Sequence, residues 1–218
     1  MSKSIPQVGF GTFLIKNDEV KDLVVKAISC GYRHIDTAEG YQNEVGVGKG
    51  IKIGLEENKL NRNDIFVTTK LWQGNADWGM PPKTYDQTLS SLDKSLENLN
   101  LEYVDLYLIH APFPKNERLD QWKALLELKK IGKAKSVGVC NYNIKHLEEI
   151  SNSGLPLPEY NQIEIHPWSQ KKELVSYLNQ KKISIIAPSS RSPNLTPISW
   201  RFTPSVSALM SADSTGIF

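Results

Sequence analysis

Apolar and polar residues are arranged along this chain in a pattern that predicts strands and helices in turn. Between residues 8 and 187, short apolar runs alternate with longer segments whose apolar residues recur every three or four positions. Leu89, Leu92, Leu96 and Leu99, for example, share one face of a predicted helix. The predicted strands are residues 8–13, 32–36, 65–71, 103–110, 134–140, 160–165 and 183–187, and the predicted helices are residues 19–29, 43–56, 85–99, 119–131, 144–151 and 173–181.

This order predicts an α/β fold, because two strands joined through a helix pair in parallel with a right-handed crossover. Seven strands and six helices fall one unit short of a (β/α)₈ TIM-type barrel, so we expect an incomplete barrel of about seven strands. Residues 188–218 differ: they are rich in Ser, Thr and Pro, and their only acidic residue is Asp213. We therefore divide the chain into a barrel domain over residues 1–187 and an irregular tail over residues 188–218.

Composition narrows the class of protein. The chain has 218 residues, of which 39% are hydrophobic and 23% charged, and a formal net charge of +2. This balance fits a soluble globular protein and gives no reason to expect binding to nucleic acid or to an anionic membrane. The absence of a hydrophobic leader near the first residues favours a cytoplasmic location. Cys30 and Cys140 have no metal-ligand or redox spacing, so we expect no metal site.

Three predicted strands carry a titratable side chain at or next to their last residue. Asp36, Lys70 and His110 occupy these positions, and Tyr41 follows Asp36 by five residues. The C-terminal ends of barrel strands meet at one rim, where barrel enzymes keep their chemistry. Each residue alone has an ordinary interpretation: a turn cap, a solvated charge, a packing residue or a buried histidine. A carboxylate, an ammonium, an imidazole and a phenol at one rim together favour a site for proton transfer.

Four ordered motifs make the chain similar to a known family. They are the sequences GYRHIDTA at residues 31–38, with Tyr41, Asn43 and Glu44 after it, LEYVDLYLIH at residues 101–110, GVCNY at residues 138–142 and NQIEIHP at residues 161–167. In these motifs the chain resembles the aldo-keto reductases, over residues 5–187. The resemblance implies a TIM-type barrel that reduces small-molecule aldehydes or ketones to alcohols with a nicotinamide dinucleotide, NADP(H) in preference to NAD(H).

The resemblance also implies a role for each titratable residue. Tyr41 would be the general acid that protonates the carbonyl oxygen. A free phenol has a pKa of about 10, and an adjacent Lys70 ammonium would lower the pKa of Tyr41. Asp36 would pair with Lys70 and hold it in place. His110 would donate a hydrogen bond to the carbonyl oxygen.

On the cofactor side, the resemblance implies a set of residues near the dinucleotide, among which Asn141 and Gln162 would bind the carboxamide. That set is Gly11, Thr12, Asp36, Cys140, Asn141, Gln162, Ser189 and Ser190. The chain departs from the family in two places: Cys140 stands where serine is usual, and Pro188 stands where an aromatic residue is typical. Beyond Ser190 the family pattern is lost. These departures leave open a second interpretation, a catalytically impaired barrel protein that binds a nicotinamide dinucleotide or serves as a regulatory subunit.

Aromatic residues that follow the strand ends are candidates for an apolar substrate pocket. Trp72 and Phe113 are the strongest, because each follows a strand that ends in a candidate catalytic residue. Residues 73–82, rich in Gly, Trp and Pro, are the predicted flap over this pocket. The pattern leaves the particular carbonyl compound and the oligomeric state open.

Overall fold

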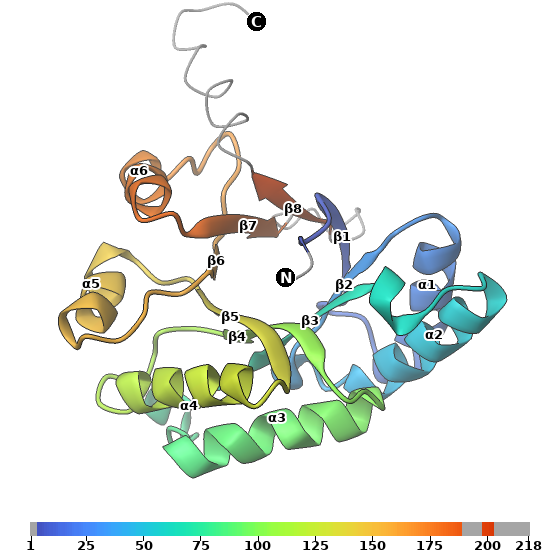
Figure 1. The fold of residues 1–218 in the computed structure, drawn as a ribbon, viewed down its shortest axis with the longest axis horizontal. Helices are drawn as coiled ribbons and strands as arrows, with labels where there is room; N and C mark the ends of the chain where they lie inside the picture. The colour runs from blue at the N-terminus through green and yellow to red at the C-terminus, as the bar shows by residue number, and fades with distance from the viewer. Residues whose placement is uncertain (1–3, 189–197, 203–218) are drawn as a thin grey trace, which may run out of the picture.

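The computed structural model describes residues 4–188 and 198–202. In this part of the chain, strands β1 to β8 form a closed barrel in sequence order, and helices α1 to α6 lie outside it (Figure 1). The strands are β1 (Val8–Gly11), β2 (His34–Asp36), β3 (Phe66–Leu71), β4 (Val104–Ile109), β5 (Ala134–Cys140), β6 (Tyr160–Gln162), β7 (Ser184–Pro188) and β8 (Ile198–Phe202). The helices are α1 (Asn17–Ser29), α2 (Glu44–Glu57), α3 (Tyr85–Leu99), α4 (Arg118–Lys130), α5 (Ile144–Asn152) and α6 (Lys172–Gln180). Three short 3₁₀ helices complete the set: η1 (Glu39–Tyr41), η2 (Arg62–Asp64) and η3 (Ala76–Trp78).

The seven parallel strands expected from the sequence are confirmed. Strands β1 to β7 pair in parallel, each with the next. Strands β1 and β6 end two and three residues earlier than expected, at Gly11 and Gln162. The polar residues that follow each of these strands therefore lie in loops at the rim of the barrel.

Residues 198–202 correct one expectation about the tail. We expected residues 188–218 to be irregular, but Ile198–Phe202 forms β8, which pairs antiparallel with both β1 and β7. Strands β1 and β7 would otherwise each present an unpaired edge, and a segment that pairs with both satisfies their main-chain groups. The sequence Ile-Ser-Trp-Arg-Phe alternates apolar and polar residues, which is a strand pattern, although it is only five residues long. Pro188, placed with the tail, ends β7.

The barrel has separate inner and outer cores. All six residues of β3 and all six of β4 are buried, because parallel strands are covered on both faces. Along β4, Leu106 and Leu108 belong to the cluster inside the barrel, whereas Tyr107 and Ile109 pack in the larger cluster that includes the helices. The period of two along a strand therefore decides which side chains point into the barrel.

Helices α1 and α2 approach each other closely through glycines of α2. A Cβ atom at Gly50 would lie 2.6 Å from the main-chain oxygen of Lys21 and 2.8 Å from the Cβ of Val24. Both distances are too short for non-bonded atoms, so this helix pair depends on the missing side chain.

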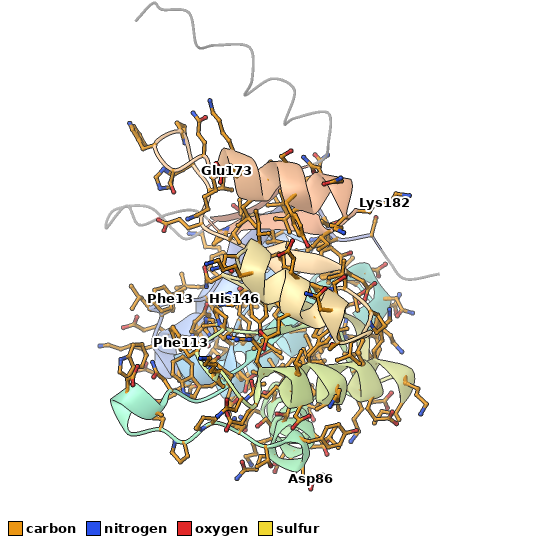
Figure 2. All side chains as sticks on the ribbon, turned by 90° about the vertical axis from the view of Figure 1, so that its left-hand side faces the viewer. Phe13, Asp86, Phe113, His146, Glu173 and Lys182 are labelled. Carbon is orange, nitrogen blue, oxygen red and sulfur yellow. The ribbon has the colours of Figure 1, made fainter. Side chains whose placement is uncertain are left out.

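The C-terminal ends of the parallel strands open on one side of the molecule. Phe13 and Phe113, which follow β1 and β4, lie on the same side in Figure 2, and Lys182, which precedes β7, lies on the other. Candidate active-site residues that follow strands are thus gathered on the side of Phe13 and Phe113. Among the described residues, no helix is both long and apolar enough to cross a membrane.

Candidate active site

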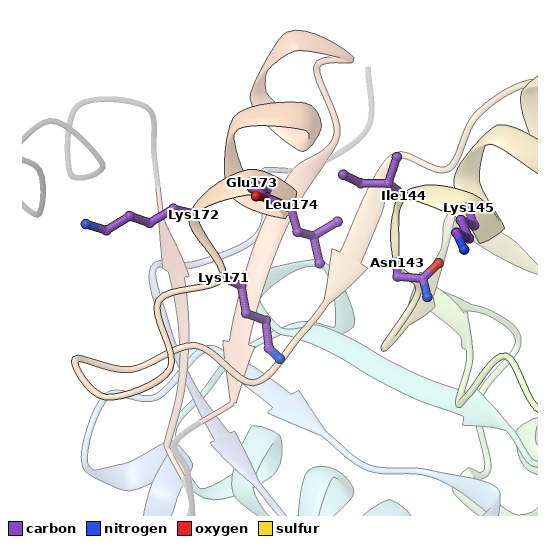
Figure 3. A pocket seen from close by; sticks show the side chains of 7 residues that line it. All are labelled: Asn143, Ile144, Lys145, Lys171, Lys172, Glu173 and Leu174. Atoms are coloured by element: carbon purple, nitrogen blue, oxygen red, sulfur yellow. The ribbon is translucent and has the colours of Figure 1, made fainter.

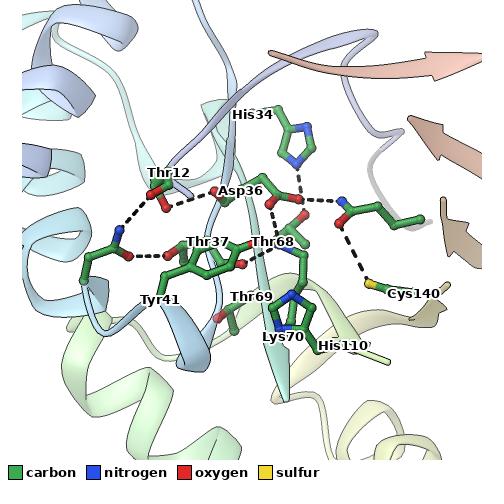
Figure 4. A network of polar contacts seen from close by, with 12 residues as sticks. Thr12, His34, Asp36, Thr37, Tyr41, Thr68, Thr69, Lys70, His110 and Cys140 are labelled. Carbon is green, nitrogen blue, oxygen red and sulfur yellow. Dashed lines mark hydrogen bonds and ion pairs between the residues drawn. The ribbon is translucent and has the colours of Figure 1, made fainter. Parts of the chain in front are cut away.

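Three strand ends and a short 3₁₀ helix bring the predicted proton-transfer residues together. Asp36 ends β2, Lys70 lies one residue before the end of β3, His110 follows β4, and Tyr41 ends η1. On β3, Lys70 lies four residues after Phe66, which packs inside the barrel, so the strand period directs Lys70 inward as well. Figure 4 shows the resulting network of polar contacts.

The Lys70 ammonium lies at the centre of this network. Its side chain is 0% exposed, and its Nζ donates to Asp36 Oδ1 at 2.5 Å, to the Thr37 main-chain oxygen at 2.9 Å and to Tyr41 Oη at 3.2 Å. An ammonium has three N–H donors, so these three acceptors satisfy it completely. The carbonyl of Thr37 is an acceptor that sequence patterns miss, because every residue carries one.

Asp36 connects the ammonium to the opposite wall of the barrel. Its Oδ2 accepts a hydrogen bond from Gln162 Nε2 at 2.8 Å, while Oδ1 faces Lys70. Gln162 Oε1 in turn accepts a weak contact from Cys140 Sγ at 3.8 Å. The chain of contacts therefore runs from Tyr41 through Lys70 and Asp36 to the end of β6.

His110 packs against two aromatic rings beside this network, those of Tyr41 and Trp72. Its ring meets the Tyr41 ring edge to face at a centroid distance of 5.4 Å and the Trp72 ring at 6.0 Å. Within the described part of the chain, the buried Nδ1 of His110 has no hydrogen-bond partner. Tyr41, Lys70 and His110 thus converge on one place at the rim.

The protonation states follow from burial and from the Lys70 charge. Burial raises the pKa of the Tyr41 phenol above its ordinary value, and the Lys70 ammonium only partly opposes this. The net direction differs from the sequence expectation of a lowered pKa, because desolvation of the phenolate outweighs the attraction. Burial, followed by the Lys70 charge, lowers the pKa of His110 to about 3. At neutral pH, Tyr41 is therefore a neutral phenol and His110 a neutral imidazole.

Lys70 remains charged in spite of its burial. Burial by itself would lower the pKa of this ammonium, but Asp36 and Tyr41 together raise the pKa above the ordinary value. A buried charge persists where an opposite charge and hydrogen bonds compensate its desolvation. The site therefore holds a permanent cation beside the phenol.

A second set of hydrogen bonds holds the segment between β2 and α2. Thr37 Oγ1 donates to Asn43 Oδ1 at 2.9 Å, and Asn43 Nδ2 donates to the main-chain oxygens of Thr12 and Ile15 at 2.8 and 2.9 Å. Thr12 Oγ1 donates to the main-chain oxygen of Asp36 at 3.2 Å. These contacts fix the turn that carries Tyr41, a function of Asn43 that sequence reasoning did not assign.

The predicted cofactor residues lie at adjacent strand ends. Asn141 follows β5 and is exposed. Its main chain is in the left-handed region, with φ of 61°. Its main-chain N–H donates to the Gln162 main-chain oxygen at 2.9 Å, so the two amide side chains begin from neighbouring points. Amide groups of this kind can hydrogen-bond a carboxamide, because each offers both a donor and an acceptor.

The remaining predicted cofactor residues lie, along the chain, at or near the ends of β1, β5 and β7. Gly11 is the last residue of β1, beside Thr12, whose hydroxyl is engaged by the Asp36 main chain. Cys140 is buried at the end of β5, and burial raises the pKa of its thiol far above the ordinary value. Ser189 and Ser190 lie outside the described residues.

The aromatic candidates form a rim beside the proton-transfer residues. The Trp72 ring stacks on Trp78 at a centroid distance of 5.9 Å and an interplanar angle of 17°, and Trp78 meets Phe113 at 5.4 Å. Phe113 and Trp78 are 48% and 60% exposed, so this apolar surface is open to solvent. We refer to Trp72, Trp78 and Phe113 as the aromatic rim.

A separate hollow lies between the first turns of α5 and α6. Its volume is about 610 Å³, and none of the four proton-transfer residues lines it (Figure 3). Its lining is Asn143, Ile144, Lys145, Lys171, Lys172, Glu173 and Leu174. Within the described residues, no group of three or more His, Cys, Asp or Glu side chains is placed to hold a metal ion.

Comparison with known proteins agrees with this architecture. Residues 7–191 match the model of the aldo/keto reductase family. The chain is 41% identical over 180 residues to the methylglyoxal reductase DkgA of Escherichia coli (strain K12), and 42% identical over 184 residues to the glyoxal reductase of Bacillus subtilis (strain 168). These alignments cover 82% and 84% of this chain but only 61% and 62% of the two relatives, so the chain spans about three fifths of their length.

The fold is also found in solved structures. The crystal structure of the Bombyx mori aldo-keto reductase in complex with NADP aligns with a TM-score of 0.78 and 33% identity. That alignment covers 96% of this chain and 72% of the silkworm protein. The family model, the relatives and the barrel agree: the chain belongs to the aldo/keto reductase family.

Proposed function

We propose that this chain reduces small carbonyl compounds to alcohols with a nicotinamide dinucleotide, and that Tyr41 is the general acid. One observation carries the proposal: the Tyr41 hydroxyl lies 3.2 Å from a fully buried ammonium, Lys70, which Asp36 holds at 2.5 Å. A neutral phenol beside a fixed cation can release a proton to a developing alkoxide, because the cation stabilises the phenolate that remains.

Each side chain has a defined part in this reaction. NADPH, when bound, supplies the hydride for the carbonyl carbon. Tyr41 donates its proton to the carbonyl oxygen, so that the C=O double bond becomes a C–OH single bond, and the phenolate then recovers a proton from solvent. Lys70 stabilises this phenolate, and Asp36 keeps Lys70 in position.

His110 acts as a neutral hydrogen-bond donor in the proposed reaction. Its pKa of about 3 keeps the imidazole uncharged in the working range of pH, so it does not compete with Tyr41 as a proton source. A donor fixed beside the carbonyl oxygen orients the substrate and stabilises charge in the transition state. The contacts with Tyr41 and Trp72 hold the ring in place.

For the cofactor, we propose that Asn141 and Gln162 bind the carboxamide of the nicotinamide. Their amide groups fit this partner, since among the described residues the contact of Gln162 Oε1 is the weak one with the Cys140 thiol, and Asn141 is exposed at the rim. Gly11, Thr12 and Asp36 would border the nicotinamide ribose, and Ser189 and Ser190 the pyrophosphate. The NADP in the silkworm relative supports NADP(H) in preference to NAD(H).

The substrates that we propose are small aldehydes and ketones, taken up at the aromatic rim. Two relatives are named for reduction of methylglyoxal and glyoxal, which supports small dicarbonyl compounds as first substrates to test. Trp72 lies beside His110, so a carbonyl near His110 would contact this apolar ring.

Tyr41→Phe tests the proposal directly. We expect kcat/KM for NADPH-dependent methylglyoxal reduction to fall by about 100- to 10,000-fold, the usual contribution of a general acid. Tyr103→Phe is the matched control, because it also loses one hydroxyl. Tyr103 precedes β4 at the other end of the barrel, and its hydroxyl donates to Asn63 Oδ1 of η2. Equal rates for the wild type and Tyr41→Phe would end the catalytic proposal.

One observation favours a second function, binding of a nicotinamide dinucleotide without reduction of a substrate. Pro188 ends β7 and offers no aromatic face for the nicotinamide to stack on. A barrel that binds the dinucleotide and reduces nothing would show saturable quenching of tryptophan fluorescence by NADPH, and no turnover in the wild type. The same titration with NADH distinguishes the two cofactors.

A further inference from the structure

The loop between β3 and α3 is closed at its base by hydrogen bonds. The Gln73 main-chain oxygen accepts from the Lys83 N–H at 3.1 Å and from Gln121 Nε2 of α4 at 2.9 Å. Gln121 Nε2 also donates to the Lys83 main-chain oxygen at 2.9 Å. The two ends of residues 73–83 are therefore tied to each other and to α4.

The tip of the loop is a small hairpin that carries part of the aromatic rim. Asn75 and Met80 exchange two main-chain hydrogen bonds, at 2.8 and 3.0 Å. Between them, η3 presents Trp78, which stacks on Trp72, and Trp72 Nε1 donates to Met80 Sδ at 3.2 Å. The base and the tip of the loop are therefore both internally bonded.

Glu39 joins this unit to the segment that carries Tyr41. Its Oε2 accepts from the Trp72 main-chain N–H at 2.9 Å, and its Oε1 accepts from Lys83 Nζ at 2.5 Å. Lys83 Nζ also donates to Ser91 Oγ of α3 at 2.7 Å. One carboxylate, two residues before Tyr41, thus holds both Trp72, which precedes the loop, and Lys83 at the end of the loop.

The packing between Glu39 and Tyr41 leaves little freedom. A Cβ atom at Gly40 would lie 3.3 Å from Cε3 of Trp72 and 3.9 Å from Nδ1 of His110. The Trp72 ring therefore rests directly on the main chain of η1. A change in the position of this main chain relative to the loop would widen or narrow the space beside Tyr41 and His110.

We propose that Glu39 is a positioning residue that sets the distance between the aromatic rim and Tyr41, and through that distance the size of carbonyl compound accepted. This role rests on the proposed reduction, because it acts on the substrate side of the same site. The side chains of Glu39 and Lys83 are 32% and 20% exposed, so their contact is partly shielded from water. Loss of the carboxylate leaves the Trp72 N–H and the Lys83 ammonium without this partner, and the loop loses its attachment to η1.

The test compares Glu39→Ala, Glu39→Gln and Lys83→Met with the wild type. Glu39→Gln keeps an acceptor for the Trp72 N–H but loses the ion pair, and Lys83→Met removes the ion pair from the other side. Asp120→Ala is the control, because it breaks an exposed ion pair with Lys123 on α4. Far-UV circular dichroism identifies any variant that does not fold.

The first readout needs no turnover. The Trp72 and Trp78 rings lie 5.9 Å apart, close enough for their electronic transitions to couple, so we expect the wild type to give a circular dichroism couplet that is lost in Trp78→Phe. We expect Glu39→Ala to lose most of this couplet, and Lys83→Met part of it. An unchanged couplet in folded Glu39→Ala overturns the proposal, even if the wild type reduces nothing.

The second readout is the division between KM and kcat. We expect Glu39→Ala to change KM for a bulky aromatic aldehyde about tenfold, the scale of a small misfit in an apolar pocket. KM for methylglyoxal and both kcat values should change less than about twofold, since the proton-transfer groups are untouched. A uniform fall in kcat for both substrates would contradict a role in size selection. An inactive wild type would instead overturn the proposed reduction.

Discussion

Lys70→Met tests whether a buried ion pair organises this site. The variant replaces a 0% exposed ammonium by an apolar side chain of similar length and leaves Asp36 Oδ1 without its cation. Tyr41 loses the charge that stabilises its phenolate, and the Thr37 main-chain oxygen loses a donor. Both stability and proton transfer should therefore change.

The size of the stability effect follows from burial. Asp36 is 5% exposed, so its carboxylate has little access to water once Lys70 is gone. Removing one partner of a buried ion pair typically costs about 3–5 kcal/mol. A domain is usually stable by only about 5–15 kcal/mol, so Lys70→Met should lose roughly a fifth or more of its free energy of unfolding. Asp36→Asn with Lys70→Met removes both charges and should recover part of that loss.

The assay is urea unfolding of the wild type, both single variants and the double variant, followed by fluorescence and circular dichroism. The double-mutant cycle isolates the coupling between the two charges. Lys123→Met serves as the control, because its partner Asp120 is exposed and the pair should contribute less than about 1 kcal/mol. If Lys70→Met destabilises the protein no more than this control, the central ion pair does not organise the site.

The remaining predictions concern pH and packing. The pKa of His110 is about 3 in the folded protein, below the ordinary 6.5. As the pH falls, this imidazole is therefore protonated in the unfolded chain before it is protonated in the folded one. The stability that this difference contributes is complete above about pH 6.5 and declines toward pH 3. The urea midpoints measured at pH 7 and pH 4.5 should therefore lie closer together in His110→Gln than in the wild type. The same difference between the two midpoints in both proteins would contradict this prediction. Gly50→Val places a Cβ 2.6 Å from the Lys21 oxygen, so we expect a loss of about 1–3 kcal/mol in urea unfolding. Lys49→Val, at an exposed neighbouring position of α2, should lose far less, and equal losses would argue against close packing of α1 on α2.

The strands and the chemistry at their ends were predictable because both are local signals. Apolar runs and helical stripes depend on neighbours within a few residues, so β1 to β7 and their helices could be assigned within a few positions. The parallel order then brings Asp36, Lys70 and His110 to one rim, as expected. Their proposed roles still await the experiments above.

Other features depend on distant segments and left little or no trace in the local pattern. Strand β8 exists because β1 and β7 leave edges that only the closed barrel brings together. The contact of Glu39 with the Trp72 main chain joins residues 33 positions apart, and no periodic pattern in the sequence predicts it.

By itself, the sequence determined the alternation of strands and helices and the residue types at each strand end, because these follow from side-chain period and turn chemistry. Only the tertiary structure decided the direction of the Tyr41 pKa, the third acceptor of Lys70 and the closure by β8. The physical reason is that desolvation and long-range hydrogen bonds depend on what surrounds a group in space, and a linear pattern records only its neighbours along the chain.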